Sequence, residues 1–96
     1  MDKFNFENEI EQADWSLLEP HHQRGALFIV DQACSLAEVA EAVASDDVDK
    51  IKFLLEQNHL SRPNEEQIKA WEMLKFQKLA SFIIVQPYVL IHLLQQ

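Results

Sequence analysis

Residues 79–94 read LASFIIVQPYVLIHLL and form the most apolar stretch of the chain. Within it, residues 82–85 are β-branched or aromatic, a composition that favours a β-strand. Pro87 has no backbone N–H to donate to a neighbouring strand. We therefore predict a strand over residues 80–86 that bends, bulges or lies at a sheet edge near Pro87.

A membrane-spanning helix is the alternative interpretation of the same stretch. The run is shorter than the ~20 residues that a spanning helix needs. Gln86 and Pro87 stand at its middle, and His92 adds a polar group near its end. We therefore expect a globular protein that does not cross a membrane. The amino terminus, MDKFNFENEIEQ, also lacks the apolar core of a signal peptide, so we expect a cytoplasmic protein.

Two further strands follow from short apolar runs elsewhere in the chain. Residues 26–30 read ALFIV between Gly25 and Asp31, and residues 60–62 stand before Pro63. Helical patterns separate these strands. The chain is thus predicted to be an α+β protein, with a small sheet of about three strands near 26–30, 60–62 and 80–86. Four to five short helices cover the sheet, and residues 1–96 form one domain.

The first helix is expected near the amino terminus, where apolar residues recur at helical spacing: Phe6, Ile10, Ala13 and Leu17. Asp14 is expected to cap a second short helical turn that directs Trp15 and Leu18 inward. Pro20 is expected to end or redirect that turn, because proline disrupts a helix interior.

Two capping signals mark later helices. Ser35 with Glu38 three residues on, and Asn64 with Gln67, each fit a capping box. The apolar stripe after Ser35 is interrupted near Asp46, and a second stripe ends near Asn58. These two stripes predict a pair of antiparallel helices.

The net charge of −8 is unevenly distributed. Residues 1–49 hold twelve carboxylates against two basic residues, whereas residues 50–96 hold four against six. No basic stripe is present, so we expect no direct binding to nucleic acid or to an anionic membrane. The acidic half indicates a solvated surface, with an acidic nucleic-acid mimic as the alternative.

Several motifs spread over residues 15–90 together resemble a small bacterial family of uncharacterised proteins, a domain of unknown function. The motifs are Trp15-x-x-Leu18, Gln23-Arg24, Leu27-Phe28-Ile29-Val30, Leu36-x-x-Val39, Ala42-x-Ala44-x-Asp46-Asp47, Arg62-Pro63, Gln67-x-x-x-Trp71 and Val85-Gln86-Pro87-Tyr88-Val89-Leu90. The resemblance implies a bacterial, cytoplasmic protein and carries over no catalytic residue. Residues 38–60 also resemble the helix pair of an ankyrin repeat, which we interpret as convergence, because no second copy is present.

Candidate chemical groups are few. His21 and His22 are adjacent, but neighbouring side chains point apart, so we expect no metal site. Cys34 is the only cysteine. Asp31 and Glu38 near it oppose formation of a thiolate, so we expect Cys34 to be a small buried residue without a chemical role. We also predict no calcium site at residues 46–49, which lack the required glycine and distal glutamate, and no cofactor.

The function favoured by these patterns is that of a non-enzymatic protein-interaction module that acts as a homo-oligomer. We predict a homodimer through residues 85–94, because their apolar side chains exceed what a three-strand sheet buries. The candidate contact residues are Trp15, His22, Arg24, Tyr88 and Ile91. The alternative is a small-molecule-binding protein or minor enzyme with His22, Arg24 and Tyr88 in one cleft.

Overall fold

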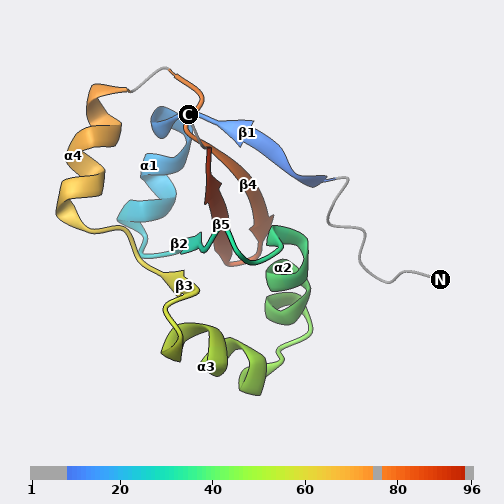
Figure 1. Cartoon of the computed structure of the whole chain (residues 1–96). Helices are drawn as coiled ribbons and strands as arrows, with labels where there is room; N and C mark the ends of the chain where they lie inside the picture. The colour runs from blue at the N-terminus through green and yellow to red at the C-terminus, as the bar shows by residue number, and fades with distance from the viewer. Residues whose placement is uncertain (1–8, 75–76, 95–96) are drawn as a thin grey trace.

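The structure of the protein, a computed structural model, describes residues 9–74 and 77–94 (Figure 1). Four helices and five strands are found in these residues. In chain order they are β1 (Glu11–Ala13), α1 (Trp15–Gln23), β2 (Leu27–Val30), α2 (Leu36–Ala44), α3 (Val48–Glu56), β3 (Leu60–Ser61), α4 (Glu65–Met73), β4 (Ala80–Val85) and β5 (Tyr88–Leu93). The predicted α+β class and the strands near 26–30, 60–62 and 80–86 are confirmed.

The five strands form one mixed sheet in the order β1-β4-β5-β2-β3. β5 is the central strand. It runs antiparallel to β4, with Ile83 opposite Leu90, and parallel to β2, with Phe28 opposite Leu90. β1 and β3 are the short edge strands and pair antiparallel with β4 and β2. The sheet therefore has two more strands than the three that the sequence predicts.

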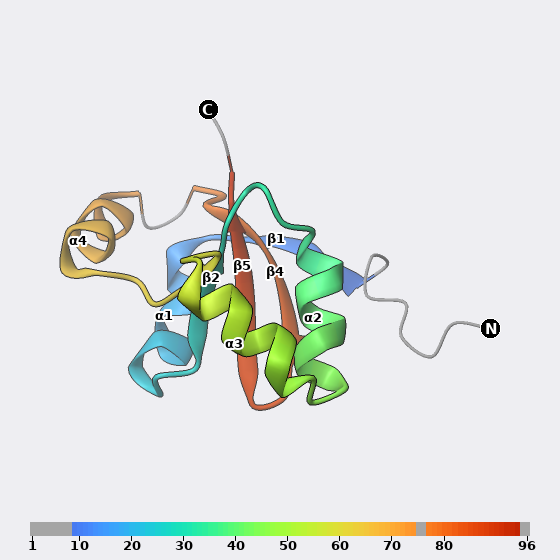
Figure 2. The same ribbon diagram turned by 60° about the horizontal axis from the view of Figure 1, so that its bottom comes forward.

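The sheet lies between two pairs of helices, so the protein has three layers (Figures 1 and 2). Alternate residues of each strand point to opposite faces. In β5, Val89 and Ile91 pack with residues of α1 and α4, whereas Leu90 packs with residues of α2 and α3. We call these two sides the α1/α4 face and the α2/α3 face. Each side has its own buried core.

Residues 87–94 were not predicted to form a strand, and this is the main correction to the sequence-based fold. Val89, Leu90 and Ile91 are at most 1% exposed, because β5 has a paired strand on each side and helices on both faces. Pro87 and Gln86 form the turn between β4 and β5, where no ladder hydrogen bond is required. Pro87 therefore marks neither a bulge nor a sheet edge.

The first predicted helix is also corrected. Residues 11–13 form β1, in which Ala13 pairs with Ala80, and the helix begins only at Trp15. Phe6 lies outside the described residues. Asp14 caps α1 as predicted, since its carboxylate accepts a hydrogen bond from the Leu17 N–H at 3.1 Å. Trp15 and Leu18 point inward, also as predicted. Pro20 does not end the helix, which continues to Gln23.

Helices α1, α2 and α3 each end at a residue of positive φ, a position that glycine usually occupies, although the chain has one glycine. Gly25, Asp46 and Asn58 follow α1, α2 and α3, and each has a positive φ, of 74°, 59° and 61°. At each end, the N–H of this residue and the next N–H bond to carbonyl groups of the last helical turn, as in a Schellman motif. Aspartate and asparagine tolerate this backbone conformation better than most residues. Asp46 and Asn58 thus occupy the positions after α2 and α3 where glycine is usual.

The two capping signals differ in the structure. Asn64 and Gln67 form the full box, with reciprocal hydrogen bonds of 2.8 and 3.0 Å. Ser35 accepts a hydrogen bond from the Glu38 N–H at 3.3 Å, and a return bond from the Glu38 side chain is not among the hydrogen bonds of the described residues. The box predicted at Asn64 is therefore confirmed, and the one at Ser35 is confirmed in its first half.

Loss of either cap should destabilise the protein. We expect Ser35→Ala and Asn64→Ala each to lower the free energy of unfolding by about 1 kcal/mol, because a helix N–H loses its acceptor. Urea denaturation followed by circular dichroism measures this change. Ser35→Gly is the matched control and should lose only a few tenths of that amount. A Ser35→Ala midpoint equal to that of the wild type would show that the cap contributes nothing.

Candidate functional site

An open groove of about 280 Å³ lies on the α2/α3 face, between α3 and the sheet. Most of its lining is apolar, and three of the side chains that border it are polar. The lining residues are Phe28, Val43, Asp46, Ile51, Leu55, Leu60, Arg62, Tyr88 and Leu90. We call this surface the Tyr88 groove. It combines parts of β2, β3, β5 and the α2–α3 pair, which are distant in the sequence.

Tyr88 is positioned by the hairpin and by an aromatic neighbour. It is the first residue of β5, directly after the Gln86–Pro87 turn, so its ring stands at the end of the sheet. The ring meets that of Phe28 edge to face, with centroids 5.7 Å apart. This arrangement is a favourable one for aromatic pairs. The side chain of Tyr88 is nevertheless 40% exposed and remains available for contact.

Arg62 supplies a positive charge at the groove. Its guanidinium carbon lies 5.0 Å from the centroid of the Phe28 ring, which is within the range of a cation–π interaction. In the part of the chain that the structure describes, the single salt bridge joins His59 to Asp31. Arg62 therefore has no carboxylate partner among those residues, and an incoming group can reach its charge.

α3 adds exposed apolar side chains beside the groove. Ile51 and Leu54 of this helix pack against the core of the α2/α3 face, whereas Val48 and Leu55 remain 62% and 47% exposed. On the other flank of the helix, Phe53 is 55% exposed. Apolar side chains gathered in this way on one small element are typical of a contact surface.

His22, Arg24 and Tyr88 do not share a cleft. The His22 ring packs near Trp15, with centroids 5.8 Å apart, and lines a separate pocket beside α4. Arg24 donates a hydrogen bond to His21 Nδ1 at 2.6 Å. Tyr88 lies on the opposite face of the sheet. The cleft predicted from these three residues is therefore wrong in its geometry.

Two other predicted contact residues lie in the interior. The side chain of Trp15 is 1% exposed and packs on Trp71 at a centroid distance of 5.3 Å. Ile91 is fully buried at the centre of the sheet. Both side chains belong to the buried core of the α1/α4 face. Neither side chain reaches the surface of the described structure.

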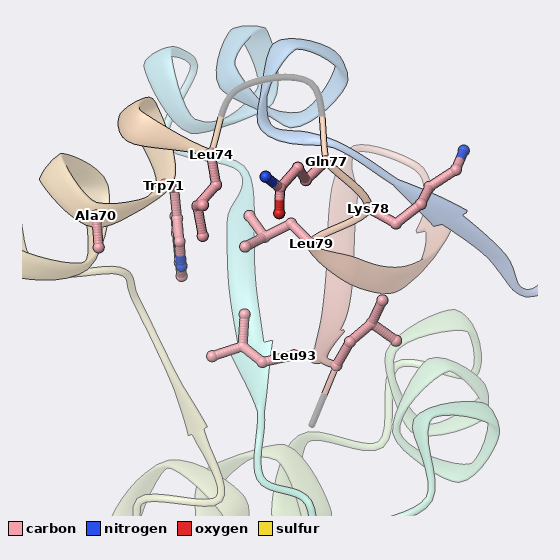
Figure 3. A pocket seen from close by; sticks show the side chains of 8 residues that line it. Ala70, Trp71, Leu74, Gln77, Lys78, Leu79 and Leu93 are labelled. Atoms are coloured by element: carbon pink, nitrogen blue, oxygen red, sulfur yellow. The ribbon is translucent and has the colours of Figure 1, made fainter. Parts of the chain in front are cut away.

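A second pocket, of about 340 Å³, lies near the end of α4 (Figure 3). Trp71, Leu74, Leu79 and Leu93 surround it, and the Gln77 carboxamide turns toward the space, as Figure 3 shows. These apolar residues border the α1/α4 core. Between Leu74 and Gln77 of its lining, residues 75–76 are outside the described residues, and we assign the pocket no role.

Asp31 connects three segments at the end of β2. Its carboxylate accepts a hydrogen bond from His59 Nδ1 at 2.9 Å, and its carbonyl oxygen lies 3.0 Å from His92 Nε2. The hydrogen bond with His59 is the main reason that the pKa of Asp31 is lowered from its ordinary value. Asp31 thus links β2 to β5 and to the segment that precedes β3.

Acid should therefore weaken the fold through Asp31. Its lowered pKa stabilises the folded state above the unfolded pKa of about 3.9, and this contribution disappears as the pH falls through the folded pKa. We expect Asp31→Asn to lower the melting temperature at pH 7. We also expect its melting temperature to fall less than that of the wild type between pH 5 and pH 3. Thermal denaturation across this range measures both. Asp49→Asn, on the surface of α3, is the control. An equal fall in melting temperature between pH 5 and pH 3 for the wild type and both variants would contradict the role of Asp31.

Cys34 is half-buried beside this cluster. Burial, with Asp31 and Glu38 nearby, raises the pKa of its thiol, in agreement with the unfavourable setting for a thiolate that the sequence indicates. The residue packs against the core of the α2/α3 face. The described residues contain no group of three or more histidine, cysteine, aspartate or glutamate side chains that could hold a metal ion.

The acidic residues do not form one surface in the described parts of the chain. Asp14 and Glu19 belong to the start and middle of α1, whereas Glu38 and Glu41 belong to α2 on the other face of the sheet. The nucleic-acid mimic requires these charges on one side, so its geometric condition is not met. Of the helices in residues 9–74 and 77–94, none has the length and apolar character to cross a membrane.

These features define a small three-layer α+β protein with an apolar groove on one face. Residues 3–93 match the family model DUF2288, described as a protein of unknown function, and the chain belongs to this family. The fold is similar to the solution NMR structure of PA1075 from Pseudomonas aeruginosa. The two share 31% sequence identity with a TM-score of 0.79, over 100% of this chain and 92% of that one. A comparison with curated proteins found no match.

Proposed function

We propose that this protein is a non-enzymatic interaction module that binds another polypeptide at the Tyr88 groove. The observation that supports this function is the position of partly exposed Tyr88 and Leu55 at an apolar groove with a charged residue on its border. Tyrosine and arginine are enriched among the residues that dominate binding energy at protein interfaces.

The shape of the groove favours a polypeptide over a small molecule. Pockets for small ligands usually bury most of the ligand. The Tyr88 groove is open, and its apolar surface continues onto the exposed side of α3 through Leu55 and Val48. A peptide or protein surface can cover the groove and the helix together.

A selection of displayed random peptides tests the proposal. We expect enriched peptides to carry apolar anchor residues and to lose at least roughly tenfold in affinity for Tyr88→Asp and Leu55→Asp, since a buried charge opposes apolar contact. Ile84→Asp is the matched control. Ile84 is 43% exposed, against 40% for Tyr88, and lies on the neighbouring strand with its side chain on the opposite face.

Binding to Ile84→Asp should equal binding to the wild type. Peptides that bind Tyr88→Asp as well as they bind the wild type would overturn the proposal. A selection from monomeric protein in which no peptide prefers the wild type over this variant would also overturn it.

A further inference from the structure

We infer that a second copy of this chain covers the Tyr88 groove, forming a two-fold dimer in which Arg62 of each protomer faces the partner's Asp46. This inference rests on the proposed function, because it names the polypeptide that the groove binds. It also replaces the predicted contact over residues 85–94. Of that segment, Tyr88 and Leu90 line the groove. Tyr88 supplies the exposed contact, since Val89, Leu90 and Ile91 are at most 1% exposed.

The distribution of charge in the groove is suited to a second copy. Asp46 stands in the turn before α3, and Arg62 follows β3, the strand that the chain enters after the other end of α3 (Figure 1). Both side chains are exposed. In a two-fold contact the same patch meets itself in reversed orientation. The acidic end of one groove therefore meets the basic end of the other.

The apolar residues between these two charges supply the centre of the contact. Leu55 and Tyr88 border the groove, and Val48 extends the surface along α3. Together they give each protomer a central apolar zone with opposite charges at its two ends. Depletion of charge at the centre and polar groups at the rim are typical of protein interfaces.

The sheet edges are less suited to self-association. A protein can dimerise by pairing the edge strands of two sheets. Here the edge strand β3 has two residues and the edge strand β1 has three, so either edge offers few backbone hydrogen bonds. The exposed apolar residues of the other helices, Leu17 and Met73, belong to α1 and α4 separately.

Sedimentation equilibrium at micromolar concentration tests the dimer. We expect the wild type to have twice the monomer mass of 11.2 kDa and Tyr88→Asp to have the monomer mass. Ile84→Asp, with similar exposure on the opposite face, should remain dimeric. Far-UV circular dichroism checks that each variant is folded. A wild-type monomer, or a dimer that survives Tyr88→Asp, would overturn the inference.

Charge reversal tests the pairing itself. Arg62→Asp and Asp46→Arg should each weaken the dimer at least roughly tenfold, since like charges then face each other across the contact. The combined variant should recover most of the lost affinity, because the reversed charges pair again. Asp46 has a positive φ, so Asp46→Asn serves as a second variant that removes the charge and tolerates this backbone. It should weaken the dimer less than Asp46→Arg does.

Failure of the combined variant to recover affinity would overturn the Arg62–Asp46 arrangement. A dimer would compete with peptides for the groove, so a failed peptide selection counts against the proposed function only when the wild type is monomeric. If the wild type is monomeric but peptides still bind in a Tyr88-dependent manner, the inference of a second copy fails and the proposed function stands. If neither is observed, both fail.

Discussion

Ile91→Ala should lower the free energy of unfolding by about 3 kcal/mol, which is a large part of the roughly 5–15 kcal/mol that stabilises a domain. Ile91 is fully buried in the central strand, and it belongs to the core of the α1/α4 face together with Trp15 and Trp71. Truncation removes apolar contacts and leaves a cavity, because β5 is held on both sides by paired strands and cannot shift to fill it.

Ile84→Ala is the matched control for this prediction. Ile84 has the same side chain on the neighbouring strand but is 43% exposed, so its truncation should cost less than about 1 kcal/mol. Urea denaturation followed by tryptophan fluorescence measures both variants. Equal losses for the two isoleucines would show that β5 does not occupy the centre of the sheet. For the same reason Ile91→Asp is unsuitable as a test of dimerisation, since the buried charge would unfold the protomer.

The sequence predicts the parts of this fold that depend on local signals. The strand at β2 follows from an apolar run between Gly25 and Asp31, and α4 follows from the Asn64–Gln67 capping box. β5 was missed because the turn that produces it, Gln86–Pro87, contains no glycine and resembles a strand terminus. Only pairing with both β4 and β2 makes residues 88–93 a strand.

β1 was missed for a related reason. Ile10, Ala13 and Leu17 recur at helical spacing, but a three-residue edge strand is determined by its partner and not by its own pattern. Ala13 pairs with Ala80, which lies 67 positions later in the chain. No property of residues 11–13 taken alone indicates this contact.

Of the residues that line the Tyr88 groove, one, Tyr88, was predicted from the sequence to be a contact residue. Tyr88 was identified because an aromatic ring with a hydroxyl group stands beside a proline. Phe28 and Arg62 were not identified as site residues, because they reach the groove through the pairing of β2 with β5 and with β3. A signal for Leu55 was present in the sequence: it lies at the border of the apolar stripe of α3, next to the buried Leu54.

Pro20→Ala should raise the free energy of unfolding by about 2–3 kcal/mol, in contrast to most substitutions. Pro20 lies inside α1, six positions after the Asp14 cap, and its side chain is exposed. There it lacks the N–H that would bond to the Ser16 carbonyl, and its ring crowds that carbonyl group. Proline is about 3 kcal/mol less favourable than alanine in a helix interior, and the greater freedom of the unfolded alanine chain offsets up to about 1 kcal/mol.

α1 continues past Pro20 because tertiary contacts outweigh this local cost. Trp15 and Leu18 are buried on the sheet, and the carbonyl groups of His21 and His22 accept hydrogen bonds from Ala26 and Gly25 at the end of the helix. Pro63→Ala is the matched control, since Pro63 precedes the α4 cap and lies outside any helix. In that variant the unfolded chain gains conformational freedom, and no helix loses an interior proline. Its melting temperature should therefore not rise. A Pro20→Ala melting temperature at or below that of the wild type would show that α1 does not extend through Pro20.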